Sequence, residues 1–185
     1  MLNEGRKLKL IELCRSMIKT YSVTGSEKEI ADFCAKSMKV LGYDDAWINE
    51  QGSVIGFIKG TGEGRSILMD GHIDTVEVTN AAKWTYDPIG ACMDNGKIYG
   101  RGAADMKGAL SAMIMAAAFF AEDHRPKGDV YVTGTSMEEV AEGRTLSTIL
   151  ESILPDLVLI GEASSLKLNI GQRGRGEIAV ETYGK

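Results

Sequence analysis

Apolar residues near the start of the chain recur at helical spacing and predict a first helix. The positions are Leu8, Ile11, Leu13, Met17 and Ile18. A second helix is expected to open at a capping-box pattern, in which Ser26 is followed three residues later by Glu29, and to run to about Leu41. Gly42 is expected to end it, so the chain opens with two predicted helices.

Short apolar runs bounded by glycine, aspartate or proline follow and predict β-strands. They cover residues 54–58, 66–69, 130–132 and 157–160. Residues 106–120 are apolar on nearly every face, which predicts a helix buried against a sheet, and residues 143–154 predict a further helix. This alternation predicts an α/β domain with a mainly parallel sheet, helices on both faces, and ligand sites at the carboxyl ends of the strands.

A glycine-rich segment, residues 60–64, separates the first two predicted strands. It lacks the Gly-Lys-Ser/Thr ending of a phosphate-binding loop. A hairpin turn is therefore favoured over a phosphate site.

Composition narrows the function classes. With 185 residues, 44% of them hydrophobic, the chain can bury one substantial core. A net charge of -5 leaves no basic surface for nucleic acid, and Arg173 and Arg175 are too few to supply one. Three cysteines without a Cys-x-x-Cys pair, no signal-peptide pattern and no run of 18 apolar residues favour a cytoplasmic protein without a membrane segment.

The predicted strand at residues 66–69 runs directly into charged side chains. Asp70, His72 and Asp74 follow it, and a plain apolar core would not tolerate them. Because His72 and Asp74 are two residues apart on extended backbone, they point to one face, where the carboxylate can accept a proton from one imidazole nitrogen. The other nitrogen is then free for a metal ion, although a histidine satisfied by its neighbouring carboxylate alone remains an alternative.

Carboxylates also end the other predicted strands and open the buried helix. Asp105 lies where a glycine-rich loop enters that helix, Glu138 and Glu139 follow the strand at 130–132, and Glu162 follows the strand at 157–160. Taken singly, Asp105 could complement a helix dipole and the glutamates could lie in a solvated loop. Together, one imidazole and several carboxylates without a thiolate favour a hydrolytic zinc site, with room for two ions.

Five segments in this order resemble the zinc-dependent amidohydrolases and metallopeptidases that include acetylornithine deacetylase, succinyl-diaminopimelate desuccinylase, aminoacylase and glutamate carboxypeptidase. They are residues 71–76, 84–88, 100–108, 138–139 and 161–162. The resemblance covers the whole chain. It implies the phosphorylase/hydrolase-like catalytic fold of zinc exopeptidases, and residues 133–139 and 172–178 look most like the selenium-metabolism-linked hydrolase subgroup.

The same resemblance implies roles for individual residues. His72 and Glu162 would hold one Zn²⁺, Glu139 the other, and Asp105 would bridge them, with Co²⁺ or Mn²⁺ as possible substitutes. Two residues would be catalytic: Asp74 would orient His72 and Glu138 would act as general base. A cis peptide is expected between Asp105 and Met106.

Members of that family are about twice as long and carry a lid domain that pairs subunits. The chain is accordingly expected to contain a catalytic domain over residues 1–172 and the truncated start of a lid, with its first strand near residues 177–183, over residues 173–185. A distal histidine that completes the second zinc site is expected to be missing, and His124 is expected to be exposed rather than a ligand. Two hypotheses remain: a hydrolase of an amide bond in N-acyl amino acids or dipeptide-like substrates, dimeric in its full-length form, or a catalytically incomplete metal-binding fragment.

Overall fold

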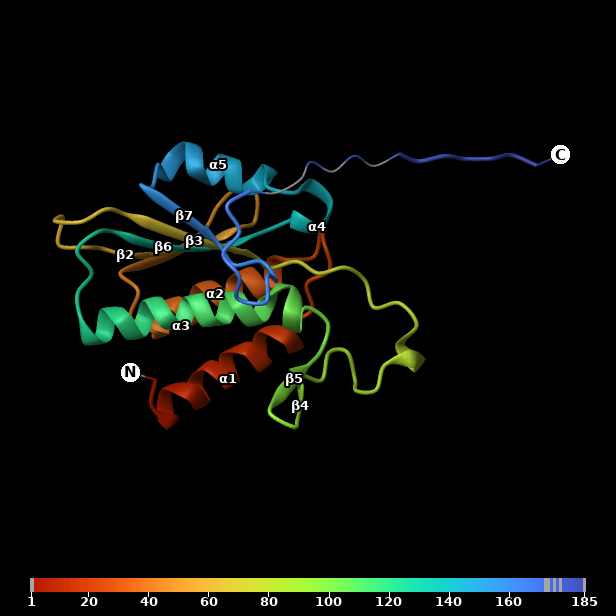
Figure 1. Ribbon diagram of the computed structural model, residues 1–185, viewed down its shortest axis with the longest axis horizontal. Helices are drawn as coiled ribbons and strands as arrows, with labels where there is room; N and C mark the ends of the chain where they lie inside the picture. Colours follow the sequence, from red (N-terminus) through yellow and green to blue (C-terminus); the bar gives the residue numbers. More distant parts are fainter. Residues whose placement is uncertain (1, 172–173, 175, 177, 185) are drawn as a thin grey trace.

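A five-stranded mixed sheet forms the centre of the computed structural model, which describes residues 2–171, 174, 176 and 178–184 (Figure 1). The strand order is β1-β2-β6-β3-β7. The strands are β1 (Asp45–Ile48), β2 (Val54–Ile58), β6 (Val130–Thr135), β3 (Ile67–His72) and β7 (Leu157–Ile160). The four strands predicted from the sequence are all present, and β1 is added at one edge.

Strand direction confirms the mainly parallel sheet. β3 pairs with β6 and β7 in parallel, while β2 runs antiparallel to both β1 and β6. The carboxyl ends of the parallel strands β3, β6 and β7 therefore lie together at one end of the sheet.

The hairpin predicted at residues 60–64 is wrong, because β6 lies between β2 and β3. This loop instead packs on the segment that precedes β6. Thr61 N donates to Pro126 O, and Gly62 N donates to Lys127 O. A glycine-rich turn is a local signal, whereas strand order is decided by the pairing of β2 with residues 72 to 80 positions further along the chain.

Helices cover both faces of the sheet, as predicted (Figure 1). α1 (Glu4–Lys19), α2 (Lys28–Val40) and α3 (Gly108–Asp123) share the main hydrophobic core on one face. α5 (Arg144–Ile153) packs on the other face, where Leu146 and Ile149 contact Ile55 and Leu68. Three small elements among the described residues were also not predicted: the 3-10 turn η1 (Ala81–Lys83), the hairpin of β4 (Cys92–Asp94) with β5 (Lys97–Tyr99), and the single-turn helix α4 (Glu138–Ala141).

The start of α2 differs from the predicted capping box. The helix begins at Lys28, and its cap residue Glu27 makes no side-chain capping hydrogen bond. The Glu27 carboxylate instead accepts a hydrogen bond from the backbone N–H of Met137, so a tertiary contact replaces the local one. The predicted end is confirmed: Gly42 adopts a positive φ of 88°, and its N–H donates to Lys39 O.

α3 is the buried apolar helix predicted at residues 106–120. The helix and the turn before it, Ala103–Asp123, are together long and apolar enough by composition to cross a membrane. However, 56% of the most apolar 18-residue stretch of this segment is buried inside the protein. A core helix packed on a sheet has these properties, and α3 contacts α1, β3 and β6.

The predicted boundary between catalytic domain and lid, at residues 172–173, lies outside the described residues. Of the predicted lid strand, Glu177 also lies outside them, and the described residues 178–184 form no strand. Isolated strands need a partner to be stable. The boundary therefore stays a prediction.

Candidate metal centre

The candidate centre lies where the carboxyl ends of the parallel strands meet. His72 is the last residue of β3 and its side chain is 1% exposed. Glu138 and Glu139 begin α4 directly after β6, and Glu162 follows β7. The sheet therefore gathers side chains that are up to 90 residues apart in sequence.

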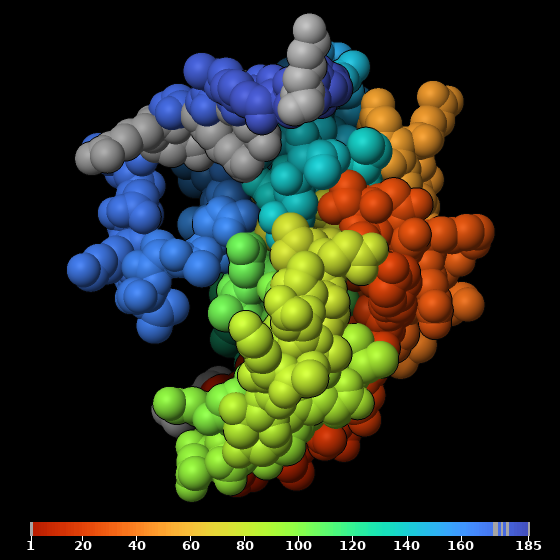
Figure 2. All heavy atoms as spheres, turned by 90° about the vertical axis from the view of Figure 1, so that its right-hand side faces the viewer, coloured from red at the N-terminus to blue at the C-terminus, as the bar shows by residue number. Residues whose placement is uncertain are grey.

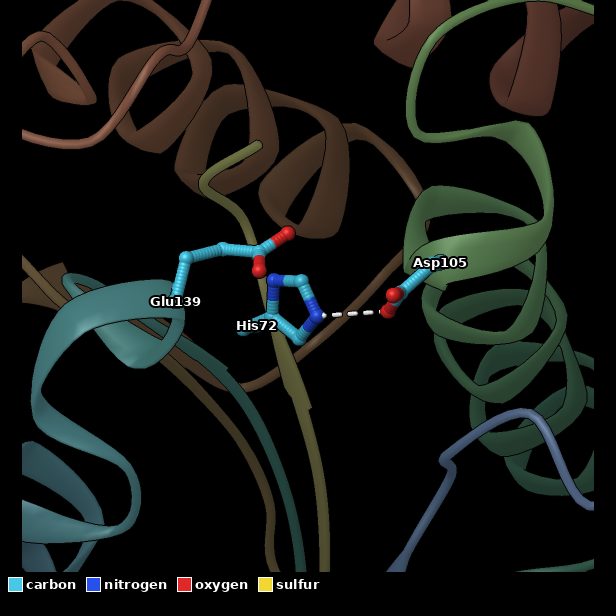
Figure 3. Close-up of side chains that lie close together, drawn as sticks. All are labelled: His72, Asp105 and Glu139. Atoms are coloured by element: carbon cyan, nitrogen blue, oxygen red, sulfur yellow. Dashed lines mark hydrogen bonds and ion pairs between the residues drawn. The ribbon is translucent and has the colours of Figure 1, made fainter. Parts of the chain in front are cut away.

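Asp105 reaches the same place from a different element. It lies in the irregular turn Ala103–Lys107 before α3, in which Asp105 and Met106 depart from helical φ and ψ, and their peptide bond is cis, as predicted. Its Oδ1 lies 2.9 Å from His72 Nε2. Figure 3 shows Asp105 and Glu139 on opposite sides of the His72 imidazole.

Further carboxylates surround His72 Nε2. Glu162 Oε1 lies 3.8 Å and Glu138 Oε2 lies 3.9 Å from this nitrogen. Two sets of three residues have ligand atoms within 4.8 Å of one another: His72 with Asp105 and Glu139, and His72 with Glu138 and Glu162. The structure thus brings together all four predicted ligands and the predicted base around one buried imidazole.

The buried carboxylate of Asp74 holds several parts of this site in place. Its fully buried carboxylate accepts hydrogen bonds from the Thr24 hydroxyl at 2.8 Å and from the backbone N–H groups of Glu138 at 3.0 Å and Glu139 at 3.2 Å. Burial raises the pKa of Asp74, but these hydrogen bonds and the contact with His72 outweigh burial and hold the pKa below its ordinary value. One carboxylate therefore positions the start of α4 as well as the histidine.

The contact between His72 and Asp74 differs in detail from the expectation. His72 Nδ1 lies 2.9 Å from the backbone carbonyl oxygen of Asp74 and 3.5 Å from its carboxylate Oδ1. The closer acceptor is thus the carbonyl oxygen of Asp74. An Nδ1–H that donates there leaves Nε2 as the nitrogen that faces the acids.

Electrostatics around the site favour a bound cation. Burial lowers the pKa of His72, but hydrogen bonds with Asp74 and Asp105 outweigh burial and raise it to about 10, because acids surround the imidazole. Burial and neighbouring acids raise the pKa of Glu138 and of Glu139, although His72 opposes this. A metal ion held by Nε2 and carboxylates would replace the Nε2 proton and relieve this repulsion. The donor set, imidazole and carboxylate oxygens without a thiolate, fits zinc, cobalt or manganese.

Comparison with known proteins agrees with this donor set. Residues 68–183 match the family model described as Peptidase family M20/M25/M40, which is more than half of the chain. The chain belongs to this M20 family. Members of the family are metal-dependent hydrolases, and all the candidate site residues described above, from His72 to Glu162, fall within the matched range.

The relatives that this M20 chain matches are longer than the chain itself. It is 32% identical over 174 residues to the uncharacterized protein YgeY of Escherichia coli K12, covering 92% of this chain and 42% of that protein. It is 31% identical over 190 residues to the succinyl-diaminopimelate desuccinylase of Wigglesworthia glossinidia brevipalpis, covering 96% and 50%. The chain therefore spans half or less of the length of these relatives.

A solved structure supports the fold of the M20 chain. The M20 family metallo-carboxypeptidase Sso-CP2 from Sulfolobus solfataricus superposes with a TM-score of 0.72 at 23% identity, over 86% of this chain and 37% of that one. At this identity the likeness shows the fold alone.

Sequence reasoning missed several supporting contacts in this M20 domain. Thr24 and Glu27, both near the start of α2, bind Asp74 and the Met137 N–H across 50 and 110 residues, and no local pattern marks them. The sequence pattern marked Asp70 only as one of the charged residues that follow the predicted strand at residues 66–69. Asp70 is buried and accepts hydrogen bonds from Thr133 and Thr135; the parallel pairing of β3 with β6 brings Thr133 opposite Asp70 and Thr135 opposite His72. His124 is exposed beyond the end of α3, as expected.

Proposed function

We propose that this chain carries the metal-binding part of a hydrolase that cleaves the amide bond of an N-acyl amino acid or dipeptide-like substrate with a water activated by two zinc ions. One observation carries the proposal: His72 Nε2 lies 2.9 to 3.9 Å from carboxylate oxygens of three separate segments, at Asp105, Glu138 and Glu162. A succinyl-diaminopimelate desuccinylase among the similar proteins supports a substrate with an amide bond.

The proposed ligands divide around His72. His72 and Glu162 would hold one ion, Glu139 would hold the second, and Asp105 would be shared by both. Bound zinc would supply Lewis acidity, which lowers the pKa of a water and polarises the scissile carbonyl. Asp74 acts as a positioning residue, because it fixes His72 from one side and the backbone of Glu138 and Glu139 from the other.

Glu138 is the proposed general base. Its side chain is 31% exposed, so it can face both a water and a substrate. Burial and neighbouring acids raise its pKa, which favours a group that accepts a proton and returns it. Glu138 would take the proton of the attacking water and pass it to the departing amine. Because Glu138 also lies within ligand distance of His72 and Glu162, its role has to be separated from that of a ligand.

Metal titration of the chain separates these roles. Co²⁺ binding is followed by visible absorption and calorimetry for the unaltered chain and for the variants Glu138→Gln and Glu162→Gln. The matched control is Glu151→Gln, at an exposed position of α5. Glu162→Gln should weaken binding at least tenfold, whereas Glu138→Gln and Glu151→Gln should retain it. Equal loss in Glu138→Gln would make Glu138 a ligand, and no loss in Glu162→Gln would remove the proposed site.

The second candidate is a metal-binding fragment without turnover. It is favoured by the share of the relatives' length that the chain spans, since the expected distal histidine and lid would lie in the remainder. Assays with added zinc or cobalt against a panel of N-acyl amino acids distinguish the two: hydrolysis that Glu138→Gln abolishes supports the enzyme, and metal binding without hydrolysis supports the fragment. Four points stay predictions: zinc as the natural metal, a cytoplasmic location, membership of the selenium-linked subgroup, and pairing of full-length subunits through a lid.

A further inference from the structure

A large pocket lies beside the candidate metal centre and takes no part in it. Its volume is about 820 Å³, within the range of small-molecule sites. Ala103 and Ala104 form one wall, and they belong to the same turn as Asp105. The other walls come from residues 79–86 and 98–100, part of the long segment that projects in front of the sheet's carboxyl edge (Figure 2).

Aromatic side chains dominate these outer walls. The rings of Tyr86 and Tyr99 lie 4.6 Å apart, and the Tyr86 hydroxyl donates to Asp94 at 2.8 Å, which fixes that pair. Trp84 also lines the pocket, and the Arg101 guanidinium lies 5.1 Å from the centroid of its ring. Flat, held aromatic rings of this kind suit another planar apolar group.

The pocket also differs in charge from the neighbouring centre. Among the described residues that line it, Lys83 is the one charged side chain, whereas Asp105, Glu138, Glu139 and Glu162 make the centre strongly acidic. An anionic substrate group that enters the pocket would be attracted to Lys83.

We infer that this pocket binds the amino-acid half of the substrate, with an aromatic side chain against Trp84, Tyr86 and Tyr99 and the α-carboxylate at Lys83. The inference rests on the proposed function, and it selects N-acyl aromatic amino acids as the substrate class. An aromatic side chain and a carboxylate on one α-carbon match the apolar wall and the single cation. The scissile amide would then lie on the side of Ala104 and Asp105.

Tryptophan fluorescence tests the inference directly on this chain. The chain has two tryptophans, Trp47 and Trp84. Trp47 lies on β1, the edge strand on the other side of the sheet from β7, so Trp47→Phe leaves Trp84 as the reporter. The Co²⁺-loaded Trp47→Phe chain is titrated with N-acetylphenylalanine, N-acetylglycine and N-acetylphenylalaninamide. The first retains both determinants, the second lacks the ring, and the third lacks the carboxylate. Lys83→Gln is compared with Lys97→Gln, an exposed lysine of β5 that does not line the pocket.

N-acetylphenylalanine should quench Trp84 and bind at least about tenfold more tightly than N-acetylglycine, since a buried phenyl ring contributes that much. Lys83→Gln should abolish the preference for the acid over the amide, and Lys97→Gln should preserve it. Equal affinity for the three compounds, or a preference that Lys83→Gln leaves intact, overturns the inference. Cobalt binding, measured separately, distinguishes the two failures: if cobalt binds and Trp84 does not respond, the pocket assignment fails while the metal centre stands.

Discussion

Replacing Asp74 with asparagine tests whether this buried carboxylate supports the centre. Asparagine has the same shape, but its amide presents one acceptor oxygen where the carboxylate presents two. Oδ2 of Asp74 accepts from both the Thr24 hydroxyl and the Glu139 N–H, so an amide nitrogen in that place would face two donors. Hydrogen bonds to a charged group contribute about 1.5 to 3 kcal/mol each, so losing two should lower the free energy of unfolding by roughly 3 to 6 kcal/mol. This is a large part of the stability of about 5 to 15 kcal/mol that is typical of a domain.

Urea unfolding at pH 7, followed by circular dichroism, measures this loss, with Asp32→Asn as the control. Asp32 is exposed and pairs with Lys28 on the same helix, so its variant should unfold at the wild-type midpoint. Cobalt affinity of Asp74→Asn should fall about 10- to 100-fold, because the start of α4 and His72 lose their common support. A variant that matches Asp32→Asn in both measurements would refute the supporting role of Asp74.

The pH dependence of this loss has a defined sign. The pKa of Asp74 is depressed in the folded protein, so its stabilising effect is present above the unfolded pKa of about 4 and is lost as the pH falls through the folded value. The stability difference between wild type and Asp74→Asn should therefore shrink below about pH 4. A constant difference across this range would mean that hydrogen bonds to the ionised carboxylate do not cause it.

Three further predictions concern other parts of the chain. Glu138→Gln should reduce any hydrolysis of N-acyl amino acids by at least about 100-fold at unchanged cobalt occupancy, and a smaller loss would argue against a general base. Burial raises the pKa of Cys34 to about 12, so about one thiol in ten thousand is ionised at pH 8; iodoacetamide should label part-exposed Cys92 in the native protein and Cys34 only after unfolding, as mass spectrometry would show. Gly128→Ala should destabilise by about 2 kcal/mol or more, because its Cβ would lie 1.9 Å from the Arg65 carbonyl oxygen. Gly5→Ala on α1, whose Cβ would make an ordinary contact 3.5 Å from Asn3 Oδ1, should be neutral or stabilise by up to about 1 kcal/mol in the same urea experiment.

Local patterns were sufficient for much of the fold. Alternating and continuous apolar runs identified β2 and β7 to the residue, since strand propensity and burial leave a direct mark on sequence. They also located the buried helix α3 and the acids that end the strands. The order of the site residues along the chain then indicated the family before any geometry was known.

Only the tertiary structure decided which of these elements meet. β6 lies between β2 and β3, the Asp74 carboxylate accepts hydrogen bonds from Thr24 and from the α4 backbone, and the Glu27 carboxylate accepts one from the Met137 N–H. Each of these contacts joins residues that are far apart in sequence. The pocket beside Ala104 likewise exists because two loops fold against the turn that carries Asp105. Such contacts depend on long-range pairing and packing, which a local pattern of apolar and polar residues does not encode, whereas the chemistry of each strand end is carried by the residues themselves.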